Sequence, residues 1–185
     1  MTALLITGLT FSAAAQNLWL TGNFRLAGTS NATSESTLTF MPEVGYLLDG
    51  PWAIGGQFGF ESQWNTNVQG ETRRESRTAI VPFVRYFLGE QASLNFFMQG
   101  ELPLNFYGGE HYNGTSMEST TSVGFAMRPG LFYAINDNWG LTVQMPSIFR
   151  IEDHEGITSY ELILNQGYTL QRYFLNTSWG ITYTF

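Results

Sequence analysis

The 185-residue sequence has no cysteine and no lysine, and few charged residues of any kind. Without cysteine, neither a disulfide framework nor a thiolate metal site is available. All eight basic residues are arginine, they form no basic cluster, and the net charge is −7, which argues against nucleic acid as a partner. Charged residues make up 12% of the chain, about half the usual share. This is low for a surface that faces water and reasonable for a wall that faces lipid.

Long hydrophobic runs are also missing. Hydrophobic residues reach 43%, yet mean hydropathy is only −0.08, so apolar residues are dispersed among polar ones. No stretch approaches the ~18 apolar residues of a spanning helix, so a membrane protein with this sequence must cross as a barrel. Residues 1–15 are interpreted as a signal peptide, with an apolar core up to Phe11 and small residues at 12–15. They lack the usual basic start. The mature domain is then expected at 16–185.

The C-terminal segment alternates strictly between two kinds of side chain. One parity runs Leu175, Thr177, Trp179, Ile181, Tyr183 and Phe185, and the other holds only small or polar residues. Successive side chains of a strand point to opposite faces. An aromatic face that ends in Phe is typical of the closing strand of a membrane barrel, where it meets lipid and the interface.

The same alternation predicts eight strands along the chain. Their expected ranges are 18–28, 36–48, 51–64, 76–87, 93–106, 119–133, 139–151 and a last strand beginning near Arg172. Three connections are tight and rich in Gly, Asn or Asp, and the longer polar segments fall near 29–35, 65–75, 107–118 and 152–171. The fold class expected is all-β, an eight-stranded antiparallel up-and-down transmembrane barrel. Pro82 and Pro129 fall inside expected strands and would require bulges.

Seven expected strands place a charged residue on the face opposite the apolar one. These residues are Arg25, Glu43, Glu61, Arg85, Glu101, Arg128 and Arg150. An eight-stranded barrel has just enough interior for side chains, and buried charges need partners. The pattern predicts a paired network in a plugged or nearly plugged lumen. A charged conduction path is the functional alternative.

Aromatic residues fall near the predicted strand ends, where two interfacial girdles would lie. The candidates are Trp52, Trp64, Phe106, Tyr133, Trp139, Trp179, Tyr183 and Phe185. Alternation alone does not say which face is outside. A soluble lipocalin-like ligand-binding barrel would reverse the arrangement, with apolar residues inside and charges outside.

Three segments carry a family resemblance: Trp179–Phe185, Pro82–Phe87, and Met127–Tyr133 followed by Asn136–Trp139. With the signal-like start and the eight alternating strands, they resemble the small outer-membrane β-barrel domain proteins, including members common in Bacteroidota. The resemblance covers nearly the whole mature chain. It implies location in the outer membrane of a Gram-negative bacterium, contact with lipid and lipopolysaccharide, and insertion by the barrel assembly machinery. It is loose for function, because such barrels include anchors, adhesins, small pores and a few enzymes.

Candidate chemical sites are weak. His111 beside Glu110 and Ser116, and His154 near Ser159, contain the residue types of a hydrolase or acyltransferase triad, but nothing fixes their geometry. The segment 152–155 offers oxygen ligands for a divalent cation without EF-hand spacing. No phosphate loop or dinucleotide fingerprint is visible. The expectation is a non-enzymatic protein without metal or cofactor, in a structural or surface-interaction role. A small porin or solute channel is the alternative, and the extracellular partner is unknown.

Overall fold

The computed structural model describes residues 17–30, 34–89, 93–162 and 177–185. Its strands are β1 (Leu18–Ser30), β2 (Ser34–Leu47), β3 (Trp52–Thr66), β4 (Thr72–Leu88), β5 (Leu94–Glu101), β6 (Leu104–Glu110), β7 (Thr120–Ala134), β8 (Trp139–Gln144), β9 (Phe149–His154), β10 (Ile157–Leu162) and β11 (Ser178–Thr184). Within these residues no helix is long and apolar enough to span a membrane.

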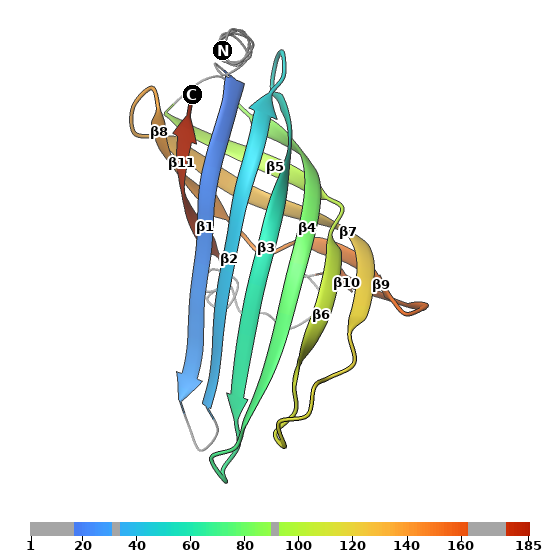
Figure 1. The fold of residues 1–185 in the computed structure, drawn as a ribbon. Coiled ribbons are helices and arrows are strands. Elements are labelled where there is room, and N and C mark those ends of the chain that lie inside the picture. Colours follow the sequence, from blue (N-terminus) through green and yellow to red (C-terminus); the bar gives the residue numbers. More distant parts are fainter. Residues whose placement is uncertain (1–16, 31–33, 90–92, 163–176) are drawn as a thin grey trace, which may run out of the picture.

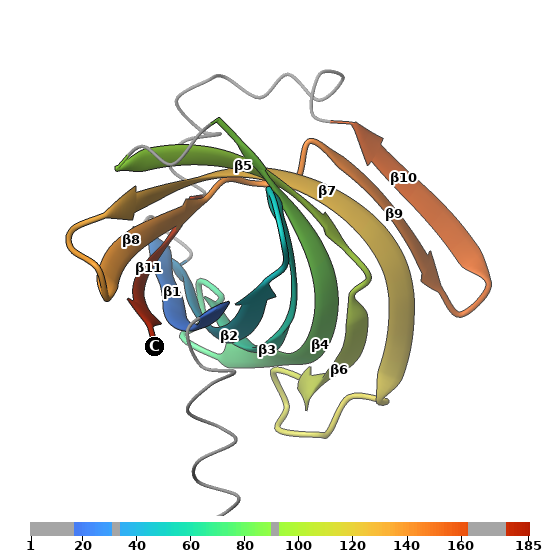
Figure 2. The same ribbon diagram turned by 90° about the horizontal axis from the view of Figure 1, so that it is seen from above.

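The strands form a closed, eight-stranded antiparallel barrel in which neighbours in sequence pair in space. β5 with β6, and β8 with β9, each take the place of one barrel strand. The ring closes where β11 pairs with both β1 and β8, and β8 pairs with β7. Figure 1 shows β1 starting and β11 ending at the same end as the short turns, and Figure 2 shows the strands surrounding a lumen. The start predicted near Arg172 lies outside the described residues. Within them, β11 begins at Ser178.

The apolar faces point outward. Large apolar side chains such as Phe24, Phe40, Phe58 and Ile181 stay about half exposed, while the charged side chains of the other parity face the lumen. A soluble lipocalin-like barrel requires the opposite orientation. The outward face is therefore the one suited to hydrocarbon.

Two strands predicted as continuous are each broken, and each break lies beside a proline on the neighbouring strand. β5 and β6 are separated at 102–103 in unchanged register, where the Leu102 amide donates to the Pro82 carbonyl (3.0 Å). β8 and β9 are separated at 145–148, where the Met145 amide donates to the Pro129 carbonyl (3.0 Å) and four residues stand opposite two. Proline offers no ladder donor. Pro82 thus lies beside a gap in the ladder and Pro129 beside a true bulge.

The long polar segments predicted as loops are loops only in part, because strands extend into each of them. β1 to β4 run well past the apolar band, and the β3–β4 connection is only 67–71, with the Asn67 side chain accepting from the amides of Gln69 and Glu71. Segment 152–171 begins with a hairpin of β9 and β10 that stands off to one side of the ring (Figure 2). Its turn residues Glu155 and Gly156 both have positive φ (52° and 82°), as primed two-residue turns require. The apolar alternation stops at the edge of the band although backbone pairing continues, so sequence pattern alone placed the strand ends too early.

Candidate functional site

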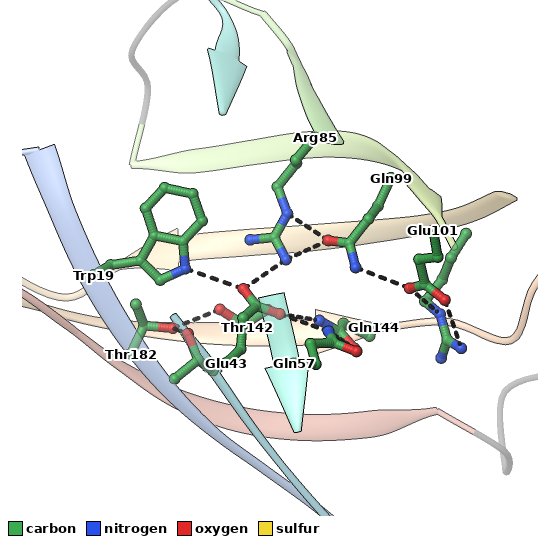
Figure 3. Close-up of polar contacts among 11 residues, drawn as sticks. Trp19, Glu43, Gln57, Arg85, Gln99, Glu101, Thr142, Gln144 and Thr182 are labelled. Atoms are coloured by element: carbon green, nitrogen blue, oxygen red, sulfur yellow. Dashed lines mark hydrogen bonds and ion pairs between the residues drawn. The ribbon is translucent and has the colours of Figure 1, made fainter. Parts of the chain in front are cut away.

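The lumen holds a buried polar layer centred on Glu43 of β2, which is 1% exposed. One carboxylate oxygen accepts from the Trp19 indole nitrogen (3.0 Å) and from Arg85 (2.8 Å). The other accepts from the amides of Gln57 and Gln144, both at 2.7 Å. Donors from β1, β3, β4 and β8 thus converge on a single side chain, as Figure 3 shows. A carboxylate with four donors and a counter-charge meets the conditions for a stable buried ion.

Arg85 extends the layer across the lumen. Its guanidinium donates to the Gln99 side-chain oxygen (2.8 and 2.5 Å), and the Gln99 amide donates to Glu101 (2.8 Å). Glu101 in turn pairs with Arg128 (2.9 Å). A hydrogen-bonded chain therefore links Glu43 to Arg128 without a gap, and removing any one member leaves buried polar groups unpaired.

Four aromatic rings surround the Arg85 guanidinium. Its central carbon lies 4.0 Å from the ring centre of Phe97, 5.1 Å from Phe83, 5.4 Å from Trp19 and 6.0 Å from Phe87. Cations are attracted to ring faces, most strongly where water is excluded. The rings and Glu43 together hold this cation inside the barrel.

Glycines on the neighbouring strands make room for three of these rings. Gly45 is the register partner of Trp19, Gly55 of Phe83 and Gly130 of Phe97. A Cβ added to these glycines would lie 2.1 Å, 2.5 Å and 2.2 Å from the respective rings. Each ring therefore rests directly on backbone. This cross-strand pairing of an aromatic with a glycine is a known way to fill a barrel interior.

The remaining predicted charges lie nearer the long-loop end. Glu61 accepts from Thr39 (3.0 Å) and pairs with Arg77 (3.3 Å). Arg150 pairs with Glu152 (2.5 Å), whose carboxylate also accepts from Ser122, Asn105 and Tyr107. Arg25 makes no ion pair with the described residues, and its Nε is buried without a partner. The structure thus pairs Glu61 and Arg150 with residues outside the predicted seven.

Sequence reasoning missed several members of the lumen. Arg77 and Glu152 had been assigned no place in the lumen, and Glu152 had been placed in a loop. Gln57, Gln99 and Gln144 fall within predicted strands, on the same face as a predicted charge. Arg77 also falls within a predicted strand, and Glu152 lies one residue beyond one, so including every polar side chain of inward parity would have found all five.

Two cavities lie on opposite sides of the polar layer. An open vestibule of about 1220 Å³ at the short-turn end has Trp19, Arg85 and Thr142 in its lining. A small cavity of about 50 Å³ on the other side is lined by Glu101, Arg77 and Arg128, among others. The two share no lining residue.

The predicted interfacial aromatics lie mostly on the outward face. Six of them are exposed there: Trp52, Phe106, Tyr133, Trp139, Trp179 and Phe185. Tyr183 is partly covered between Trp139 and Phe185, with ring centres 4.9 and 5.0 Å apart. Trp64 is also half-buried, opposite Arg74, where the outward face is already polar.

The candidate chemical sites do not assemble in the described residues. No described side-chain hydrogen bond joins His111 to Glu110 or Ser116, and the ring of His154 packs edge-on against Tyr107 (5.6 Å). Glu152 faces the lumen, whereas Asp153 is engaged with the hairpin turn through Gly156 and Thr158. In the part of the chain that is described, no three His, Asp or Glu side chains are placed to hold a metal ion.

Comparison with known proteins adds a structural likeness. No family model and no curated protein sequence matches the chain. Among solved structures, the crystal structure of Neisserial surface protein A (NspA) is similar, with a TM-score of 0.53 and 16% sequence identity. The alignment covers 91% of this chain and 97% of that one. At this identity the likeness concerns the fold, a small eight-stranded barrel of the outer-membrane type.

Proposed function

We propose that this chain is an integral outer-membrane barrel of a Gram-negative bacterium, non-enzymatic and closed to solutes, with a structural or surface-interaction role. The observation that carries the proposal is the orientation of the two faces. Apolar side chains cover the outside of the barrel wall, and the described inward charges other than Arg25 have ion-pair partners. A charged side chain on the lipid face near the midplane costs roughly 2–4 kcal/mol, so this arrangement suits a bilayer.

The plugged lumen is supported by the polar layer. Glu43, Gln57, Arg85, Gln99 and Gln144 are each at most 3% exposed and lie between two cavities with no common lining residue. The rival function is a small pore, for which the charged chain would be the conduction path.

The long-loop end is proposed as the surface that meets an external partner. Lipid and lipopolysaccharide would surround the wall, and the barrel assembly machinery would insert it. The β9–β10 hairpin carries two highly exposed apolar side chains, Tyr160 at 83% and Ile157 at 74%. These two side chains offer a partner apolar surface to bind.

Single-cysteine labelling tests location and orientation, because the native chain has no cysteine. Gln69→Cys sits in the β3–β4 turn, and Asp137→Cys sits in the short turn after β7; both positions are exposed. A membrane-impermeant maleimide added to intact cells should label the first variant only, and lysis should expose the second. Equal labelling of both in intact cells, or recovery of the protein in the soluble fraction, would overturn the membrane proposal.

Conductance across planar bilayers tests the plug. The wild-type protein should give no large, stable open-channel current. Replacing Glu43 and Arg85 together by Ala should raise conductance, whereas the same double change at the exposed Arg73–Glu75 pair should not. Large stable currents from the wild type would establish the pore instead.

A further inference from the structure

Three arginines converge on the small cavity of the lumen. The cavity of about 50 Å³ is lined by Arg77 of β4, Arg128 of β7 and Arg150 of β9, with Glu101 as the one carboxylate among its described lining residues. Bringing three guanidinium groups together inside the barrel is unfavourable unless negative charge compensates them. Their contacts therefore decide whether the cavity has the capacity to bind a ligand.

The protein partners engage only part of each guanidinium. Arg77 and Arg150 each use one Nη atom, toward Glu61 and Glu152. Arg128 donates one Nη to Glu101 (3.4 Å), while its buried Nε, 2.9 Å from the same carboxylate, makes no hydrogen bond. A guanidinium carries five N–H donors in a planar fork. Donors therefore remain on all three groups, and the cavity between them is the place where an acceptor would meet several at once.

The surroundings add one cation without an ion-pair partner. Among the described residues on this side of the polar layer, Arg77, Arg128 and Arg150 are paired with Glu61, Glu101 and Glu152, and Arg73 is paired with Glu75. Arg25 has no ion pair among the described residues, and its neighbour on the same face, Asn23, is 1% exposed with both side-chain amide atoms unpartnered. Neither residue lines the cavity, but the Arg25 charge favours an anion within it.

Size and shape restrict the anion. A cavity of 50 Å³ accommodates roughly four water-sized probes, at about 10–15 Å³ each. That is the scale of nitrate, sulfate or phosphate and excludes nucleotides and sugar phosphates. Guanidinium groups bind oxyanions through two parallel hydrogen bonds. The rest of the wall is partly apolar and partly polar, with Met41, Ala79, Val81, Pro103, Ala126, Asn105 and Ser147.

We propose that this cavity is a binding site for one small inorganic oxyanion of the size of phosphate or sulfate, held by Arg77, Arg128 and Arg150. The site goes beyond the proposed function and stands whether or not the lumen conducts.

Titration calorimetry on the full chain in detergent micelles tests the site. Inorganic phosphate and sulfate, added in low-chloride buffer, should each bind saturably with one ion per barrel. Arg150→Gln should weaken the affinity roughly 10- to 100-fold, the loss expected for one charge-assisted contact. Arg73→Gln, at the exposed Arg73–Glu75 pair, is the matched control and should leave affinity unchanged.

Two further measurements keep the test decisive if the single variant folds poorly. The pair Arg128→Gln with Glu101→Gln removes one donor group while preserving charge balance, and it should also weaken binding. Crystals of the wild type grown with selenate should show an anomalous peak between the three guanidinium groups. Absence of saturable binding to the wild type, an equal loss in Arg73→Gln, or a selenate peak only outside the lumen would overturn the proposal. Conductance and cell labelling test the proposed function and not this site, so their failure would leave the anion-binding result unchanged.

Discussion

Replacing Arg85 by Met should be among the most destabilising single changes in this barrel. The Arg85–Glu43 pair is 2.8 Å long, and the two side chains are 2% and 0% exposed. At an effective dielectric of about 20, the attraction across that distance is roughly 6 kcal/mol. Removing one partner of a buried pair costs about 3–5 kcal/mol, because the other charge stays buried without compensation. Arg85→Met should therefore lower the free energy of unfolding by that amount.

A double-mutant cycle separates the pair from the packing around it. Glu43→Gln alone should cost a similar amount, since it leaves the Arg85 cation inside its ring of aromatics. The double variant removes both charges and leaves one acceptor oxygen at position 43, which serves either Trp19 or the pair Gln57 and Gln144. It should fall within about 2 kcal/mol of the wild type, as replaced buried pairs often do.

Urea unfolding in phospholipid vesicles, followed by tryptophan fluorescence, provides the measurement, with unchanged m-values as the check that the unfolding reaction is the same. Arg73→Met is the control, because Arg73 and Glu75 are 40% and 42% exposed and such pairs contribute about 0–1 kcal/mol. A cost below about 1 kcal/mol for Arg85→Met, equal to the control, would refute the reasoning. So would a double variant as unstable as the sum of the singles.

Three further predictions concern the wall. Gly130→Ala should cost about 1–3 kcal/mol of unfolding free energy, because its Cβ would lie 2.2 Å from the buried Phe97 ring; Gly56→Ala, with nothing within 4 Å, should not. Equal urea midpoints for the two would contradict the ring-on-glycine packing. Phe58→Arg, at a side chain 55% exposed on the outward face, should lower the free energy of unfolding in vesicles by roughly 2–4 kcal/mol. Gln69→Arg, in the β3–β4 turn, should leave it unchanged. An unchanged free energy of unfolding for Phe58→Arg would count against a lipid-facing band. Pro82→Ala should leave stability unchanged or slightly raised, because it restores a ladder donor opposite Leu102, although Pro103 stays in the gap. A drop of more than about 1 kcal/mol would contradict this.

The sequence predicted the architecture because the two faces of each strand differ so strongly. Alternation between residues such as Phe58 and Gln57 fixes parity, and parity survives small errors in strand boundaries. Alternation alone fits a soluble barrel turned inside out, but the scarcity of charge and the aromatic C-terminal face predicted that the apolar side chains point outward, and the structure confirms it. The ion-pair partners were not predictable either. Arg77 and Glu152 lie where the outward face turns polar, and which residues meet across a lumen depends on register, which the sequence pattern alone does not specify.

The ring of aromatics around Arg85 escaped prediction for a related reason. Trp19, Phe83 and Phe97 lie on the parity expected to be polar, so they read as exceptions until the register placed each of them opposite a glycine. From the sequence alone, the inward-facing glycines have no recognisable role. In the folded barrel, the missing side chain of each glycine leaves the space that the opposite ring occupies.

The bulge between β8 and β9 has a consequence for how such a chain tolerates change in length. Four residues there stand opposite two, so the surplus is an even number and every later side chain keeps its face. One residue more or fewer would turn Arg150 and Glu152 toward lipid and bring Phe149 and Ile151 into the lumen. A change of two residues within the wall therefore keeps every later side chain on its face, whereas a change of one residue does so only where a bulge absorbs it.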